Sequence, residues 1–297
     1  MINQENTHKT AYEFDMMPAD KFVEEISKLP KREEVIKGIL PKGQVMLIAG
    51  DPWSGKSLEF QRLSCEFGKG GSYHGLKCNK CRAAYFTWEG AGDSIAERFN
   101  RLLDVIKPEL APLVKMFPEP IPLNTRIGYN MMYSVLEKCK QDFPDLEVVM
   151  YDSFPYLIDG KIKEDDTLST WWSQMTKLHH AFDLTPIFVY EERKLIMGSK
   201  QSEDPFGLQR LKGSYQIAYK ANTVIMIGEE KGAERSGENV NWVSKGHRIA
   251  VAKVKDGRGR FERLEVDLNR DTLQFEGQRW VFNNDIKEYE ATEEMRR

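Results

Sequence analysis

The chain has 297 residues, with 43 Lys and Arg against 46 Asp and Glu, and a formal net charge of −3. This length suffices for one large α/β domain with short extensions, or for two small domains. The near-neutral charge argues against a protein that coats nucleic acid by bulk charge, although it permits a local basic channel. The sequence has no apolar run near the roughly 18 residues of a membrane span and no secretory signal pattern. With four cysteines, it is expected to be a cytoplasmic protein with reduced thiols.

The first predicted element is a short amphipathic helix over residues 19–29, which follows a polar stretch. The apolar positions on one face of this helix are Phe22, Val23, Ile26 and Leu29. Such a face packs on the helix's own domain or docks on a neighbouring subunit, and the sequence leaves both alternatives open.

The next segment has the pattern of a strand, a glycine-bearing loop and a helix. Residues 44–49 form an apolar run typical of a buried parallel strand, and residues 58–67 repeat apolar side chains at helical spacing. Between them, residues 50–57 read Gly-Asp-Pro-Trp-Ser-Gly-Lys-Ser, which matches the phosphate-binding loop G-x-x-x-x-G-K-[ST]. The loop amides and the helix N-terminus would point at phosphate, so we predict that the chain binds ATP. The predicted nucleotide-binding residues are Gly50, Asp51, Pro52, Trp53, Ser54, Gly55, Lys56, Ser57 and Leu58.

Strands and helices alternate along the middle of the chain. The predicted strands cover residues 82–88, 147–151 and 186–190, and the predicted helices cover residues 93–105, 131–139 and 168–182. Residues 108–123 carry five prolines and are predicted as a loop-rich connection. The alternation indicates an α/β fold, with a mostly parallel twisted sheet and helices on both faces.

The pattern changes after residue 220. Three further strands are predicted at residues 223–227, 248–253 and 262–267, and they resemble antiparallel hairpins that continue one edge of the sheet. We therefore expect three regions. They are a polar segment with a linker helix over residues 1–37, an ATPase domain over residues 38–275, and a charged tail over residues 276–297.

Two acidic residues end predicted strands at the edge where doubly wound sheets bind ligands. Asp152 would hold Mg²⁺ through water, together with the hydroxyl of Ser57, while Lys56 would neutralise the β- and γ-phosphates. Glu89 stands where a glutamate can orient and deprotonate the water that attacks the γ-phosphate. By position alone, a surface glutamate at a strand end is an equal alternative for Glu89.

Cys78 and Cys81 have the spacing of half a zinc site, and His74 lies close by in the sequence. A structural site needs a fourth ligand, for which Cys65 and Cys139 are the remaining cysteines. Two reduced thiols on a loop are the favoured interpretation.

Several of these segments together resemble the RecA/DnaB-type ATPase core, and in spacing the compact hexameric helicases of the plasmid RepA kind. The resemblance covers residues 38–268 and includes the phosphate-binding loop, the Glu89 strand with its following helix, and the strand that ends in Asp152-Ser153. It implies a RecA-like sheet and a catalytic role for Glu89.

The resemblance also implies two further site positions. The family carries a γ-phosphate sensor, usually Gln or His, after the fourth strand, where this sequence offers Glu191 or Glu192 followed by Arg193 and Lys194. Residues 252–257, Ala-Lys-Val-Lys-Asp-Gly, resemble the hairpin that supplies a basic finger to the next subunit's nucleotide. We expect the finger to be Lys255, which would reach that nucleotide together with Lys253, and Arg258 or Arg260 is the alternative finger.

The resemblance implies an ATP-dependent motor on single-stranded DNA, a replicative-type helicase core that works as a homo-oligomer, expected to be a hexameric ring. Other replication proteins are possible partners, and no membrane is expected. The candidate DNA-contacting loops are residues 160–163 and 194–212, which carry several lysines and arginines. Two alternatives remain. One is a filament-forming recombination or repair ATPase, and the other is a nucleotide-gated regulator that moves nothing.

Overall fold

A computed structural model provides the structure of the chain. It describes residues 16–29, 32–52, 54–103, 111–161, 165–191, 208–211, 215–236, 239–255, 263–269, 274–281 and 288–289. The chain divides into two compact units, Met1–Glu33 and Glu34–Arg297. Among the described residues, no helix combines the length and apolar character needed to cross a membrane.

The first unit contains the predicted amphipathic helix, α1 (Ala19–Lys28). The helix begins after Pro18, and Leu29 follows its last residue in an extended conformation. None of its residues is buried, and its apolar stripe is exposed. Lys28 pairs with Glu24 one turn earlier, which is a surface interaction of small energy.

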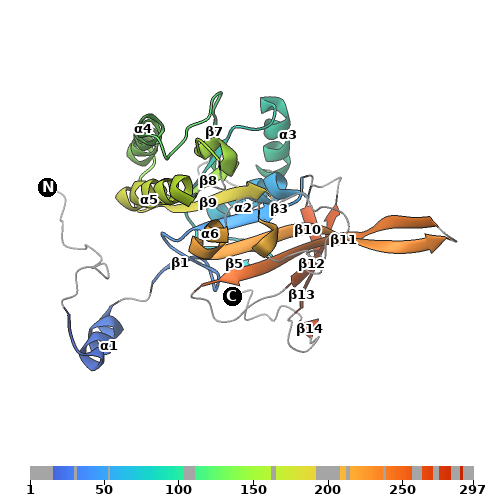
Figure 1. Cartoon of the computed structure of the whole chain (residues 1–297), viewed down its shortest axis with the longest axis horizontal. Helices are drawn as coiled ribbons and strands as arrows, with labels where there is room; N and C mark the ends of the chain where they lie inside the picture. Colours follow the sequence, from blue (N-terminus) through green and yellow to red (C-terminus); the bar gives the residue numbers. More distant parts are fainter. Residues whose placement is uncertain are drawn as a thin grey trace. The chain divides into compact units, whose positions relative to one another are not determined.

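The second unit is built on a ten-stranded sheet with the order β14-β13-β12-β11-β10-β3-β9-β8-β6-β7 (Figure 1). Pairing is parallel from β10 through β7 and antiparallel from β10 through β14. The parallel strands are β3 (Met46–Gly50), β6 (Arg82–Thr87), β7 (Leu113–Met116), β8 (Leu146–Asp152) and β9 (Thr185–Glu191). The strands at the other edge are β10 (Thr223–Ser236), β11 (Asn239–Val254), β12 (Arg263–Asn269), β13 (Gln274–Val281) and β14 (Glu288–Tyr289). The predicted mostly parallel sheet with antiparallel hairpins at one edge is confirmed.

Helices cover both faces of this sheet. One face carries α2 (Lys56–Lys69) and α3 (Gly92–Leu103), and the other carries α4 (Arg126–Asp142), α5 (Asp165–Ala181) and α6 (Tyr215–Lys220). Two short hairpins, β1 (Glu34–Ile36) with β2 (Leu40–Pro41) and β4 (Ser72–Tyr73) with β5 (Leu76–Lys77), lie on the α2 side.

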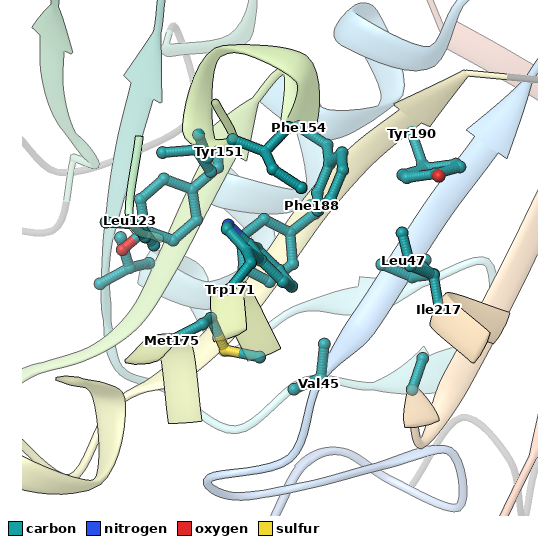
Figure 2. Close-up of a cluster of buried hydrophobic side chains, with 14 of the residues drawn as sticks. Val45, Leu47, Leu123, Tyr151, Phe154, Trp171, Met175, Phe188, Tyr190 and Ile217 are labelled. Atoms are coloured by element: carbon teal, nitrogen blue, oxygen red, sulfur yellow. The ribbon is translucent and has the colours of Figure 1, made fainter. Parts of the chain in front are cut away.

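The sheet has a hydrophobic core on each face because alternate strand residues point to opposite sides. In β8, Val148 and Met150 join the α2 core, whereas Val149 and Tyr151 join the other. Figure 2 shows the second core, where Trp171 of α5 lies over the sheet against Phe154 and Phe188. Trp171 is fully buried.

The structure adds strands where the sequence predicted loop or tail. Residues 108–123 were expected to be loop-rich, yet Leu113–Met116 forms the edge strand β7 beside β6. This strand has four residues and is largely exposed, so it lacks the alternation of buried and exposed side chains by which strands are predicted. The β10–β11 hairpin also extends beyond the predicted apolar segments, and β13 begins before the predicted charged tail. These strands pair through backbone N–H and C=O groups, which nearly every residue has, so the amino-acid sequence does not reveal the pairing.

A buried histidine in the second core gives a pH-dependent stability. Tyr151 Oη donates to His179 Nε2 at 2.8 Å, and His179 Nδ1 donates to the Met175 carbonyl at 2.7 Å. These contacts suit the neutral ring protonated on Nδ1. Burial lowers the pKa of His179 to about 4.

We predict that His179 makes the fold less stable as the pH falls from about 6.5 towards 4, because the unfolded chain takes up the proton first. The contribution is about 3 kcal/mol by the usual conversion. Urea unfolding of the wild type and of His179→Gln at pH 7 and pH 5 measures it, and the variant should lose less stability on acidification. An equal loss in both proteins would contradict the assignment.

Candidate nucleotide-binding and hydrolysis site

The predicted phosphate-binding loop joins the end of β3 to the start of α2. Gly50 ends the strand. Packing requires a glycine at this position, because a Cβ would collide with the Ile227 carbonyl oxygen of β10. Gly55 has a φ of 88° immediately before α2, which is the left-handed region that favours glycine. The Lys56 ammonium donates to the Asp51 carbonyl at 2.6 Å. The segment therefore has the strand, loop and helix geometry that suits a phosphate group.

Most predicted nucleotide-binding residues lie in this short connection. Ser54 and Leu58 are buried, Pro52 is exposed, and Trp53 lies outside the described residues. The Ser54 amide donates to the Asp51 carbonyl at 3.2 Å, which forms a turn within the loop.

Arg210 contacts the phosphate-binding loop, which sequence reasoning did not predict. It ends the short 3₁₀ helix η4 (Leu208–Arg210), and its Nη2 lies 3.1 Å from Asp51 Oδ2. Arg210 is buried, whereas the Asp51 side chain is half-exposed. The sequence assigned Arg210 to the candidate DNA-contacting loop 194–212, most of which lies outside the described residues.

The parallel sheet brings the predicted carboxylates to the same edge. Strand β8 ends at Asp152, and Glu89 follows the end of the neighbouring β6 by two residues. Asp152 is buried, and its burial raises the pKa of the carboxyl. Glu89 raises it further, while hydrogen bonding by Tyr85 and Ser57 and the charge of Lys56 lower it. Three other predicted site residues, Lys56, Ser57 and Glu89, therefore lie within interaction range of Asp152.

The two oxygens of Asp152 have different surroundings. Oδ2 accepts a hydrogen bond of 2.7 Å from Tyr85 Oη. Oδ1 is buried and has no hydrogen-bond partner among the described residues. Carboxylate and hydroxyl oxygens are the protein ligands of Mg²⁺, which keeps several waters of its own. The orphaned Oδ1 and the nearby Ser57 hydroxyl thus fit a magnesium site.

Glu89 is exposed, but three hydrogen bonds with Ser153 and Thr87 hold it in place. Its Oε1 accepts from Ser153 Oγ at 2.7 Å. Its amide donates to Thr87 Oγ1 at 3.1 Å, and this hydroxyl donates to the Glu89 carbonyl at 3.0 Å. Gly90, with a φ of 88°, then turns the chain away from the sheet. This leaves Glu89 as an exposed carboxylate at the carboxyl edge, as a water-activating residue requires.

The cysteine pair lies away from this edge. Cys78 and Cys81 are buried, and burial raises the pKa of both thiols to about 12. The ring of His74 contacts Glu59 at 2.5 Å and Arg62 at 2.9 Å. Both thiols are therefore protonated, as expected for buried cysteines.

Two expected positions remain only partly described. Glu191 ends β9 beside Gly50 of β3, whereas Glu192, Arg193 and Lys194 lie outside the described residues. Of the finger candidates, Lys255 is exposed after β11, and Arg258 and Arg260 lie outside the described residues. Lys253 is engaged within its own chain, because its ammonium donates to three carbonyls at the end of α6.

Comparison with known proteins identifies the family. Residues 10–195, more than half of the chain, match the model of a family described as AAA domain. Among solved structures, a chain described as an ATPase domain matches with a TM-score of 0.56 and 16% identity, over 88% of this chain and 99% of that one. No curated protein matches the chain significantly in sequence. The chain therefore belongs to this AAA domain family and is a P-loop ATPase with a RecA-like α/β fold.

Proposed function

We propose that this ATPase is a motor on single-stranded DNA, a replicative-type helicase core that hydrolyses Mg²⁺-bound ATP at the interfaces of a homo-oligomer. The observation that carries the hydrolytic part is the convergence of Lys56, Ser57, Glu89 and Asp152 at one sheet edge. The DNA and ring parts rest on the resemblance of motif order and spacing to hexameric replicative helicases, and on the RecA-like fold.

Each side chain has a distinct role in this proposal. The amides at the start of α2 and the Lys56 ammonium bind the β- and γ-phosphates. Ser57 and Asp152 would hold Mg²⁺, which neutralises charge on the β- and γ-phosphate oxygens when bound. Glu89 orients the attacking water and accepts its proton, and Ser153 keeps one oxygen of that carboxylate fixed.

A second subunit would complete the site. Lys255 is exposed at the end of β11, and Arg258 follows it in the sequence. A cation contributed from a neighbouring subunit stabilises the charge that develops on the transferred phosphoryl group. Single-stranded DNA would contact residues 160–163 and 194–212, of which Lys161 is described and exposed.

The central prediction concerns ATP hydrolysis with and without single-stranded DNA. We expect Mg²⁺-dependent hydrolysis that DNA stimulates. Glu89→Gln should lower kcat by about 10²–10⁴-fold while ATP still binds, because it removes the base without removing phosphate contacts. Lys56→Ala should lose hydrolysis and weaken ATP binding. The matched control is Glu97→Gln, an exposed glutamate of α3 that pairs with Arg101.

Each failure in this experiment removes a different part of the proposal. Normal hydrolysis by Glu89→Gln would exclude Glu89 as the base. Hydrolysis that is indifferent to DNA would exclude the motor and favour a nucleotide-gated regulator.

The shared-site prediction concerns Lys255. Lys255→Ala alone should hydrolyse ATP poorly, and so should Lys56→Ala alone. Mixing the two proteins should restore part of the activity, because some interfaces then combine an intact phosphate-binding loop with an intact finger. Lys115→Ala, which changes an exposed lysine on β7, serves as the control for surface charge. Full activity of Lys255→Ala, with no recovery on mixing, would exclude this finger.

A further inference from the structure

Each of the two carboxylates is held by a hydroxyl that comes from the other strand. Tyr85 of β6 donates to Asp152 Oδ2, which ends β8, at 2.7 Å. Ser153, the residue after β8, donates to Glu89 Oε1, which follows β6, also at 2.7 Å. The two hydrogen bonds therefore cross between neighbouring parallel strands at the edge where ATP would bind.

The strand register explains why Tyr85 reaches Asp152. Tyr85 lies opposite Met150, and Thr87 lies opposite Asp152. Tyr85 and Asp152 are thus diagonal neighbours on the same face, at a separation that a long aromatic side chain spans. The Tyr85 ring is buried and packs edge-on against Phe60 of α2 and Phe99 of α3. Its hydroxyl is therefore fixed in direction as well as in position.

The direction of the Tyr85 hydrogen bond follows from its second partner. Gln61 Nε2 of α2 donates to Tyr85 Oη at 3.3 Å, so the phenol proton is left for Asp152. The hydrogen bonds from Gln61 to Tyr85 and from Tyr85 to Asp152 therefore connect the carboxylate to α2, the helix that begins at Lys56 of the phosphate-binding loop.

The Tyr85 contact also selects which oxygen of Asp152 is available. Oδ2 is occupied by the phenol, and Oδ1 is the buried oxygen without a described partner. Loss of the phenol would remove the hydrogen bond that holds Oδ2 and would let the carboxylate rotate. Outer contacts of this kind orient metal-holding carboxylates, and their loss commonly weakens metal binding by about 10–100-fold.

The Ser153 contact acts in the same way on Glu89. An exposed glutamate has several rotatable bonds, and Ser153 fixes Oε1 so that Oε2 is left for water. On the basis of the proposed function, we infer that Tyr85 and Ser153 are positioning residues. They form a crossed hydroxyl pair that aims Asp152 at Mg²⁺ and Glu89 at the attacking water.

The test for Tyr85 measures how Mg²⁺ changes the affinity for ADP, by titration calorimetry with and without the metal. Tyr85→Phe should bind ADP normally without Mg²⁺ but need about 10–100-fold more Mg²⁺ for the tighter complex. The matched control is Tyr151→Phe, which also removes a buried phenol hydrogen bond, to His179 on the other face of the sheet. A wild-type Mg²⁺ response in Tyr85→Phe would overturn its positioning role.

The test for Ser153 separates rate from binding. Ser153→Ala should lower kcat at least several-fold with ADP and Mg²⁺ affinities unchanged, and Ser153→Thr should restore the rate because it keeps the hydroxyl. Unchanged kcat in Ser153→Ala, or no rescue by threonine, would overturn its role. If the wild type binds ADP without any Mg²⁺ response, the proposed function fails together with this inference. If the wild type responds to Mg²⁺ and hydrolyses ATP but Tyr85→Phe and Ser153→Ala behave like it, only the positioning roles of Tyr85 and Ser153 are excluded.

Discussion

The parallel register of four neighbouring strands is the constraint on which the rest of the site depends. Strands β3, β9, β8 and β6 run in the same direction, so their carboxyl ends lie at one edge. The phosphate-binding loop leaves β3 there, and Asp152 and Glu89 leave β8 and β6. A hydrophobic core on each face holds these strands in register, since a shift of one residue would turn every buried side chain to the wrong face.

The carboxylates Asp152 and Glu89 bring negative charge to this edge, and neighbouring hydroxyl and ammonium groups stabilise it. Asp152 is buried beside Glu89, an arrangement that raises its pKa, and the hydroxyls of Tyr85 and Ser57 with the charge of Lys56 oppose the rise. A second buried carboxylate, Glu59, lies in the first turn of α2. Burial would raise the pKa of Glu59, but the charges of Arg62 and His74 outweigh that effect and lower it to about 2. Acidic side chains near a helix N-terminus are also favoured by the helix dipole. Each of the two buried carboxylates, Asp152 and Glu59, therefore has hydrogen-bonding or positively charged partners.

Much of this arrangement follows from the sequence, because apolar periodicity and the phosphate-binding loop are local signals. The alternation of strands and helices predicted the parallel sheet, and the position of Asp152 at a strand end placed it at the right edge. The edge strand β7 was missed, because pairing through the backbone of an exposed strand needs no distinctive side chains. The pairings Tyr85–Asp152, Ser153–Glu89 and Arg210–Asp51 were missed for another reason. Each joins residues 64 or more positions apart in the sequence, and only the strand register or the chain path shows that they meet.

The most direct measurement is a crystal structure of the protein with Mg²⁺ and a non-hydrolysable ATP analogue. We expect the triphosphate to lie on the loop of residues 50–57, with Mg²⁺ beside Ser57 and the Oδ1 side of Asp152. We also expect a water molecule within hydrogen-bonding distance of Glu89 and in line with the γ-phosphate. A nucleotide bound elsewhere, or a metal held away from Asp152 with no water beside Glu89, would contradict this expectation.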